Sequence, residues 1–349
     1  MDSVDIGGRA IGGGRCFVIA EAGVNHNGNP LLARRLIDAA ADAGADAVKF
    51  QTFDPDLLAD RHAETAEYQK RALGEAGSQL DMLRGLVLPR AEYPALVAHA
   101  RERHLTFLST PFDNGSADFL ETLGLPAFKV SSGDLTNALL LRHLSRKGKP
   151  LLIATGMANQ DEVAAALETV RLAGPVPVVV LHCVSNYPTA PADCNLKAMA
   201  AMRAALGVPV GFSDHTSGSA VALAAAALGA VVIEKHLTLD RSLPGPDHQA
   251  SVEPRQFLEM VAGIRDVEQS LGTSQKAAVP SETPIAAIGR RSLHWAHAMH
   301  EGDVVREEDL VALRPATGMS PERWREVVGG RLVRAVERHE QVSPGDVRR

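Results

Sequence analysis

Two histidines stand at the ends of short apolar runs, which are typical of buried strands. His215 closes the run Gly211-Phe-Ser-Asp-His215, and His236 closes Ile233-Glu-Lys-His236. Neutral imidazoles are common ligands of divalent metals, and two of them side by side can hold one while leaving positions for water and a substrate oxygen. A histidine at such a position is also a common structural residue. The residues alone therefore leave a metal site and a packing role open.

Lysine and hydroxyl side chains end several other apolar runs. They are Lys49, Lys129, Thr110, Ser132, Ser185 and Ser213. Ammonium and hydroxyl donors gathered in one place can form a cradle for a phosphate or carboxylate group. A buried lysine could instead be a Schiff-base nucleophile, or could pair with a carboxylate such as Glu21 or Asp134. The pattern predicts an anion site and leaves these alternatives open.

The strands and helices that would position these residues are expected to alternate regularly along the chain. Short apolar runs bounded by Gly, Pro or Asn are each followed by an Ala-rich amphipathic stretch, which is typical of parallel βα units. The runs are 17–21, 47–51, 106–109, 127–130, 150–154, 176–182, 209–212 and 231–234. This order predicts an α/β protein with a (β/α)8 TIM barrel. A doubly wound sheet is the competitor, but no GxGxxG turn follows any of the runs.

A barrel would bring the polar residues together, because catalytic groups project from the carboxyl ends of its strands. Alternation along a strand sends Lys49 and Gln51 to the same side, so both can point into the barrel. The segment 54–88 is long, polar and partly helical, and it is predicted to be an elaborated loop over this mouth.

The rest of the chain predicts a second, smaller domain. The barrel should occupy residues 1–272, because the eighth helical pattern ends near Leu271. Residues 273–284 have the composition of a linker, and a small domain should follow at 285–349.

Composition argues against nucleic-acid binding, a disulfide-rich fold and a membrane location. A net charge of −6 gives no general attraction to nucleic acid. The 3 cysteines are too few and too scattered for a disulfide framework, which predicts a reducing, cytoplasmic location. No apolar stretch has the length and side-chain volume to span a membrane, so no membrane partner is expected.

Several motifs together are specific enough to indicate a family. They are Ile19-Ala-Glu-Ala-Gly-Val-Asn-His-Asn-Gly28, Val48-Lys-Phe-Gln-Thr52, the two histidine runs, Leu243-Pro-Gly-Pro-Asp-His-Gln-Ala-Ser251 and Leu313-Arg-Pro-Ala-Thr-Gly-Met-Ser-Pro321. With them the chain resembles the sialic acid synthase family, which includes N-acetylneuraminate and legionaminate-type nonulosonate synthases. The resemblance implies a TIM barrel followed by a small antifreeze-like (SAF, β-clip) domain. It also implies a domain-swapped homodimer, in which Arg314 reaches the partner's sugar site.

The resemblance also implies an activity: metal-dependent condensation of phosphoenolpyruvate with an N-acylated mannosamine-type aldehyde, giving a nine-carbon 2-keto sugar acid and phosphate. His215 and His236 would hold Mn²⁺ or Mg²⁺ and, with Asp134 and Glu21, form the catalytic set. Asp134 would take a proton from the attacking water. Phosphoenolpyruvate would contact Lys49, Thr110, Lys129, Ser132, Ser185 and Ser213. The sugar would contact Glu21, Gln51, Tyr187, Asp247 and Arg314.

Three questions stay open at this level. The acceptor could be N-acetylmannosamine or a diacetamido-trideoxy sugar, and no additional basic motif supports a phosphorylated acceptor. Ala154 stands where some relatives carry a hydroxyl, and Ser185-Asn186 replaces an asparagine-first pattern, so these two contacts with phosphoenolpyruvate differ. The alternatives are a Schiff-base aldolase using Lys129 or Lys235, or a non-catalytic sugar-binding or scaffold protein.

Overall fold

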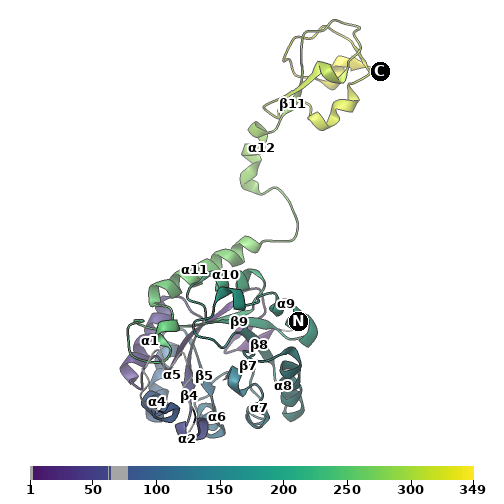
Figure 1. Cartoon of the computed structure of the whole chain (residues 1–349). Helices are drawn as coiled ribbons and strands as arrows, with labels where there is room; N and C mark the ends of the chain where they lie inside the picture. The colour runs from purple at the N-terminus through teal and green to yellow at the C-terminus, as the bar shows by residue number, and fades with distance from the viewer. Residues whose placement is uncertain (1–2, 62, 64–77) are drawn as a thin grey trace. The chain divides into compact units, whose positions relative to one another are not determined.

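The computed structural model describes residues 3–61, 63 and 78–349. The chain divides into two compact units, Met1–Gly272 and Thr273–Arg349, which carry the purple-to-green and the green-to-yellow parts of the ribbon in Figure 1. Each unit has a hydrophobic core of its own. The segments predicted as linker and small domain both fall in the second unit.

The first unit is an eight-stranded parallel barrel. Its sheet order is β5-β4-β3-β10-β9-β8-β7-β6, and every neighbouring pair in this order is parallel. The consecutive strands β5 and β6 stand at the two ends of this order, so the barrel is nearly closed. The strands are β3 Phe17–Gly23, β4 Ala47–Thr52, β5 Thr106–Pro111, β6 Phe128–Val130, β7 Leu151–Ala154, β8 Val178–Cys183, β9 Val210–Asp214 and β10 Val232–His236. The predicted (β/α)8 barrel is confirmed.

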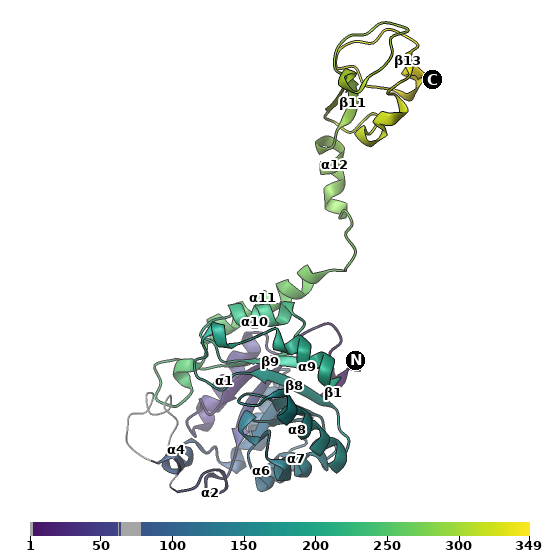
Figure 2. The ribbon, with the colours of Figure 1, turned by 45° about the vertical axis from the view of Figure 1, so that its right-hand side comes forward.

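Helices alternate with the strands and surround them (Figures 1 and 2). They are α1 Pro30–Asp42, α5 Tyr93–Glu102, α6 Asn114–Thr122, α7 Ala138–Ser145, α8 Gln160–Ala173, α9 Ala198–Leu206, α10 Ala220–Ala227 and α11 Pro254–Leu271. Helix α1 shows why they form. The Asn29 side chain caps its first turn, Pro30 occupies a position where no backbone donor is needed, and the buried face carries Ala33, Leu36, Ile37 and Ala40 at helical spacing.

Most strands extend beyond the predicted runs at their carboxyl ends. The run 209–212 becomes Val210–Asp214, and 231–234 becomes Val232–His236. The residues added to these two strands, Ser213, Asp214, Lys235 and His236, are polar, so hydropathy ends the predicted strands too early. All four are nevertheless buried.

The amino end of the barrel is closed by a hairpin of β1 Val4–Ile6 and β2 Arg9–Ile11. Its apolar residues join a core cluster with Phe17 and Ile19 of β3. Asp46 fixes the hairpin in place, because its carboxylate pairs with Arg9 and, at 2.7 Å, with Arg265 of α11. The hairpin thus packs against the ends of the strands opposite to those that carry most of the predicted site residues.

The expected loop 54–88 is described in part. Helix α2 Pro55–Leu58 and helix α4 Gln79–Leu86 belong to it, whereas residues 62 and 64–77 lie outside the described residues. Residues of α4 line the cavity at the carboxyl end of the barrel.

The second unit is small and mixed. After α12 Thr283–Gly289, strand β11 Ser292–Trp295 pairs antiparallel with β12 Leu310–Leu313, and β13 Arg331–Leu332 pairs with β14 Val347–Arg348. Trp295, which is 0% exposed, lies in its core. Within the ranges that the structure describes, we find no helix with the length and apolarity that a membrane crossing requires.

Candidate active site

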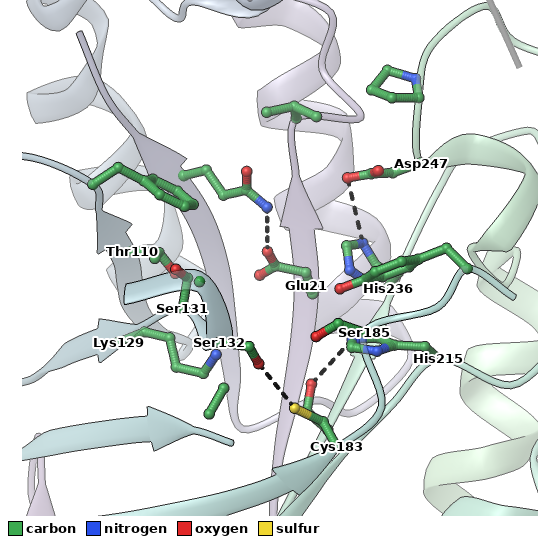
Figure 3. A pocket seen from close by; sticks show the side chains of 18 of the residues that line it. Glu21, Thr110, Lys129, Ser131, Ser132, Cys183, Ser185, His215, His236 and Asp247 are labelled. Atoms are coloured by element: carbon green, nitrogen blue, oxygen red, sulfur yellow. Dashed lines mark hydrogen bonds and ion pairs between the residues drawn. The ribbon is translucent and has the colours of Figure 1, made fainter. Parts of the chain in front are cut away.

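One cavity of about 520 Å³ gathers most of the predicted site residues at the carboxyl ends of the strands (Figure 3). Twelve of them line it: Glu21, Lys49, Gln51, Thr110, Lys129, Ser132, Ser185, Tyr187, Ser213, His215, His236 and Asp247. Asp134 and Arg314 are not among the lining residues.

Two lysines and two glutamates form the charged floor of this cavity: Glu21, Lys49, Lys129 and Glu234. The Lys49 Nζ atom lies 2.6 Å from Glu21 and 3.8 Å from Glu234, and Lys129 Nζ lies 3.4 Å from Glu234. All four side chains are buried. Their formal charges balance, which lets four ionisable groups share a site away from water.

Neutral donors complete the floor. The Lys49 ammonium donates to Thr110 Oγ1 at 3.0 Å, and the Gln51 amide donates to Glu21 Oε1 at 3.1 Å. The Ser213 hydroxyl donates to Glu234 Oε1 at 3.0 Å. These hydrogen bonds hold the charged groups in one arrangement.

The pKa values of the two floor glutamates shift in opposite directions. Burial raises the pKa of Glu21 against the opposing effect of Lys49. Burial acts on Glu234 in the same direction, but the ammonium groups of Lys129 and Lys49 outweigh it and lower the pKa of this carboxyl. Glu234 is therefore the permanent anion of the floor, and Glu21 is the carboxyl that can take up a proton near neutral pH.

The sequence analysis did not select Glu234, although a signal for it was present. Glu234 lies two residues before His236 on β10. Because side chains alternate along a strand, the two must face the same side. The same rule that paired Lys49 with Gln51 thus identifies Glu234.

A hydroxyl and thiol cluster lies beside the floor. The Gly156 N–H donates to Ser132 Oγ at 3.0 Å and to Cys183 Sγ at 3.1 Å, and these two acceptor atoms are 3.2 Å apart. A Cβ atom on Gly156 would stand 2.2 Å from Ser185 Oγ and 2.9 Å from Ser132 Oγ. The sequence analysis did not predict Gly156 and Cys183 as site residues, because a glycine and an isolated cysteine at a strand end do not by themselves indicate a binding or catalytic role.

His215 directly follows β9 and His236 ends the adjacent strand β10, and their ring centroids are 5.6 Å apart. The Nδ1 atom of His215 is 2.6 Å from the Val184 carbonyl, which can only accept, so Nδ1 carries the hydrogen and Nε2 keeps its lone pair. The buried Nδ1 atom of His236 has no hydrogen-bond partner, and Asp247 lies 4.0 Å from it. Burial lowers the pKa of both imidazoles, which favours the neutral form that binds metals.

These two histidines fit an open metal site. An orphaned ring nitrogen in a buried polar cavity is an observation that a bound cation would explain. No group of three or more His, Cys, Asp or Glu side chains arranged around a single point was found within residues 3–61, 63 and 78–349. The two imidazoles would therefore supply part of a coordination sphere, with water or substrate oxygen completing it.

One side of the cavity is apolar. Val24, Met82, Leu83, Leu86 and Phe112 line it, and we call these residues the apolar wall. With Phe53, Leu58 and Val87 they form a cluster separate from the barrel core. Most of this wall comes from α4, which falls within the segment that the sequence predicted as a partly helical loop.

Asp134 lies in a short 3-10 turn, Ser132–Asp134, next to the cavity but not lining it. Its carboxylate accepts hydrogen bonds from Ser131 Oγ at 2.6 Å and from Asn137 Nδ2 at 3.2 Å. Arg314, the other absent residue, is exposed and follows β12 in the second unit. Lys235 is not a lining residue either, because it pairs with Asp214 at 2.6 Å.

Comparison with known proteins now decides the family. Residues 36–276 match the NeuB family, and residues 290–348 match the SAF domain. The chain belongs to the NeuB family. The resemblance to sialic acid synthases is thereby confirmed, together with the barrel followed by an SAF domain and the expectation of a synthase-type enzyme.

Individual relatives make different products. The chain is 45% identical to the N,N'-diacetyllegionaminic acid synthase of Legionella pneumophila, over 91% of this chain and 90% of that protein. It is 33% identical to the human N-acetylneuraminate-9-phosphate synthase, over 96% and 94%. Among solved structures, the N-acetylneuraminic acid synthetase of Leptospira borgpetersenii superposes with a TM-score of 0.71 at 32% identity, covering 81% of this chain and 95% of that one.

Proposed function

We propose that this NeuB-family enzyme condenses phosphoenolpyruvate with the aldehyde form of an N-acylated mannosamine-type sugar. A bond forms between C3 of phosphoenolpyruvate and the aldehyde carbon, and the aldehyde oxygen becomes a hydroxyl. Water adds at C2 and phosphate leaves, which gives a nine-carbon 2-keto sugar acid. The observation that carries the proposal is that one cavity holds two buried lysines beside two histidines whose pKa burial lowers.

The floor would bind phosphoenolpyruvate through its phosphate and carboxylate. Lys49 and Lys129 supply the positive charge, and the hydroxyls of Thr110, Ser132, Ser185 and Ser213 line the same cavity. Such preorganised donors also stabilise the charge that develops as phosphate departs. Ala154 adds no hydroxyl, and Gly156 instead brings a backbone N–H to the same cluster.

His215 and His236 would hold the divalent cation, Mn²⁺ or Mg²⁺. When bound, such a cation polarises the carbonyl of the sugar aldehyde. The chain's own contribution is to keep both imidazoles neutral by burial and to fix the His215 ring through the Val184 carbonyl.

The sugar would lie against Glu21, Gln51, Tyr187 and Asp247, which line the cavity near the imidazoles. Asp134 keeps its proposed role as the base for the attacking water, and this role requires exchange of its hydrogen bonds with Ser131 and Asn137. Glu234 would hold both lysines in place beneath phosphoenolpyruvate. These roles are the ones that the family resemblance implies, except the role of Glu234, which rests on its contacts with the two lysines.

We further propose a homodimer in which Arg314 completes the acceptor site of the partner subunit. This rests on the sequence resemblance and on the exposed Arg314 side chain. A cytoplasmic location agrees with three cysteines that are all free: Cys16, Cys183 and Cys194.

The decisive experiment measures phosphate release from phosphoenolpyruvate with Mn²⁺. N-acetylmannosamine and 2,4-diacetamido-2,4,6-trideoxymannose are supplied in parallel, and EDTA and His236→Ala serve as controls. We expect release that needs both a sugar and the metal and is lost in the variant. Release that persists in EDTA, with trapping by borohydride, would instead support a Schiff-base aldolase.

A further inference from the structure

We propose that the buried ion pair between Lys235 and Asp214 positions the two histidines that would hold the metal. The inference rests on the proposed function, because it takes His215 and His236 as the ligands of the cation. Neither Lys235 nor Asp214 lines the cavity. Both would therefore act as positioning residues, through the histidines that follow them in the chain.

The pair lies on the other face of the barrel sheet from the histidines. Glu234 and His236 of β10 line the cavity, and Lys235 stands between them. Because side chains alternate along a strand, Lys235 points away from the cavity. Asp214 is directly opposite Lys235 in the register of β9 and β10, and each partner directly precedes one of the histidines. A change in the distance between the partners must therefore move the strand ends that carry both imidazoles.

Three hydrogen bonds connect Lys235, Asp214 and Thr216, and they enclose His215. The Lys235 ammonium donates to Asp214 Oδ2 at 2.6 Å and to the Thr216 carbonyl at 2.7 Å. The Asp214 Oδ1 atom accepts the Thr216 N–H at 2.9 Å. The His215 carbonyl accepts the Thr189 N–H at 2.8 Å. These contacts fix the backbone before, at and after His215.

The position of His236 depends more on the backbone of its strand than that of His215 does. The Val184 carbonyl fixes the His215 ring through Nδ1, at 2.6 Å. Within the described ranges, no hydrogen-bond partner reaches the buried Nδ1 atom of His236. The placement of this second ring therefore depends on the end of β10, which the Lys235 side chain connects to β9.

Stability alone does not account for the pair. The Lys235 side chain is 1% exposed and that of Asp214 is 0% exposed. Taking two charges out of water is costly, and an uncharged pair of similar size is often as stable. Directional hydrogen bonds, however, fix the distance between two strand ends more closely than apolar packing does. Metal binding requires such precision, because ligand distances must agree to within about 0.2 Å.

The test measures Mn²⁺ binding to the metal-free, full-length protein from the electron paramagnetic resonance signal of the free ion. The double variant Lys235→Met/Asp214→Asn replaces the pair by uncharged groups of similar size, and the asparagine oxygen can still accept the Thr216 N–H. It leaves no buried charge without a partner, so it should fold and melt near the wild-type temperature. We expect its dissociation constant for Mn²⁺ to be about tenfold or more higher, since groups that orient metal ligands contribute this much.

Two controls separate this effect from a general loss of structure. The dissociation constant for phosphoenolpyruvate, measured by calorimetry without metal, should not change in the double variant, because Lys49 and Lys129 are intact. Lys147→Met is the matched variant: its side chain is 8% exposed and pairs with Asp118 and Glu121 of α6. None of these three residues lines the cavity, so this variant should bind Mn²⁺ as the wild type does.

Wild-type affinity for Mn²⁺ in the folded double variant, or an equal loss of affinity in Lys147→Met, would overturn the positioning role. So would a double variant that does not fold, since the pair would then serve the stability of the barrel. A wild-type protein that does not bind Mn²⁺, with or without phosphoenolpyruvate, would instead contradict the metal site of the proposed function.

Discussion

Glu21 links substrate binding to pH at the level of a single residue. Burial raises its pKa to about 7, with Lys49 opposing the shift. When Glu21 is protonated, the Lys49 ammonium is available to an incoming anion; when Glu21 is ionised, its charge competes for Lys49 and repels the anion. Phosphoenolpyruvate should therefore bind more weakly as the pH rises through this pKa.

Calorimetry on metal-free protein between pH 6 and 8.5 can measure this effect. We expect affinity to fall by up to about tenfold per pH unit above the pKa. Because phosphoenolpyruvate itself titrates in this range, the comparison is with Glu21→Gln, in which the excess slope should disappear. Parallel pH profiles for the two proteins would show that Glu21 does not control binding.

At the residue scale, chemical type was enough to find the histidines, lysines and most of the hydroxyls that line the cavity. His215, His236, Lys49 and Lys129 could be predicted because few positions in the chain follow an apolar run with such side chains, and all four line one cavity. Cys183, Gly156 and the local hydrogen bonds of Asp134 could not be predicted, because they depend on how neighbouring strand ends approach each other.

At the scale of elements, the path of the loop between β7 and α8 determines how the hydroxyls of the cavity are placed. It passes so close to the ends of β6 and β8 that Gly156 meets Ser132 and Ser185 without space for a side chain. Gly156→Ala must therefore displace one or both hydroxyls. We expect the KM for phosphoenolpyruvate to rise by about tenfold or more, since a charge-assisted hydrogen bond contributes about 1.5–3 kcal/mol.

Gly133→Ala is the control for this change. It lies in the same cavity lining, and its added Cβ would meet only Ser131 Oγ at 3.8 Å. Steady-state kinetics and a melting curve should show near wild-type behaviour for Gly133→Ala and a selective KM effect for Gly156→Ala. A loss of folding in both variants, or no KM difference between them, would contradict the role assigned to this loop.

At the scale of elements, periodicity located the strands but not their ends. Buried polar residues such as Ser213 and His236 interrupt the apolar pattern just where the strands reach the site. The segment 54–88 was recognised as an elaboration of the mouth from its length and polarity. Its partly helical character was also expected, but the role of α4 in lining the cavity could not be assigned, because it depends on packing against Phe53 and Phe112.

At the scale of the whole molecule, the second unit, Thr273–Arg349, still needs a function. Composition predicted a small domain after a linker, and the SAF match covers residues 290–348. Sequence alone could not show which subunit's site Arg314 serves, since that depends on how two chains assemble.

Complementation between two inactive variants can answer it. His236→Ala and Arg314→Ala chains with different tags are co-expressed, and the heterodimer is isolated by tandem purification. If Arg314 serves the partner's barrel, the heterodimer contains one complete site of two and should show about half of the wild-type phosphate release. Each variant homodimer should be nearly inactive. A heterodimer as inactive as the homodimers would place Arg314 in the site of its own chain, because every site would then carry one of the two substitutions.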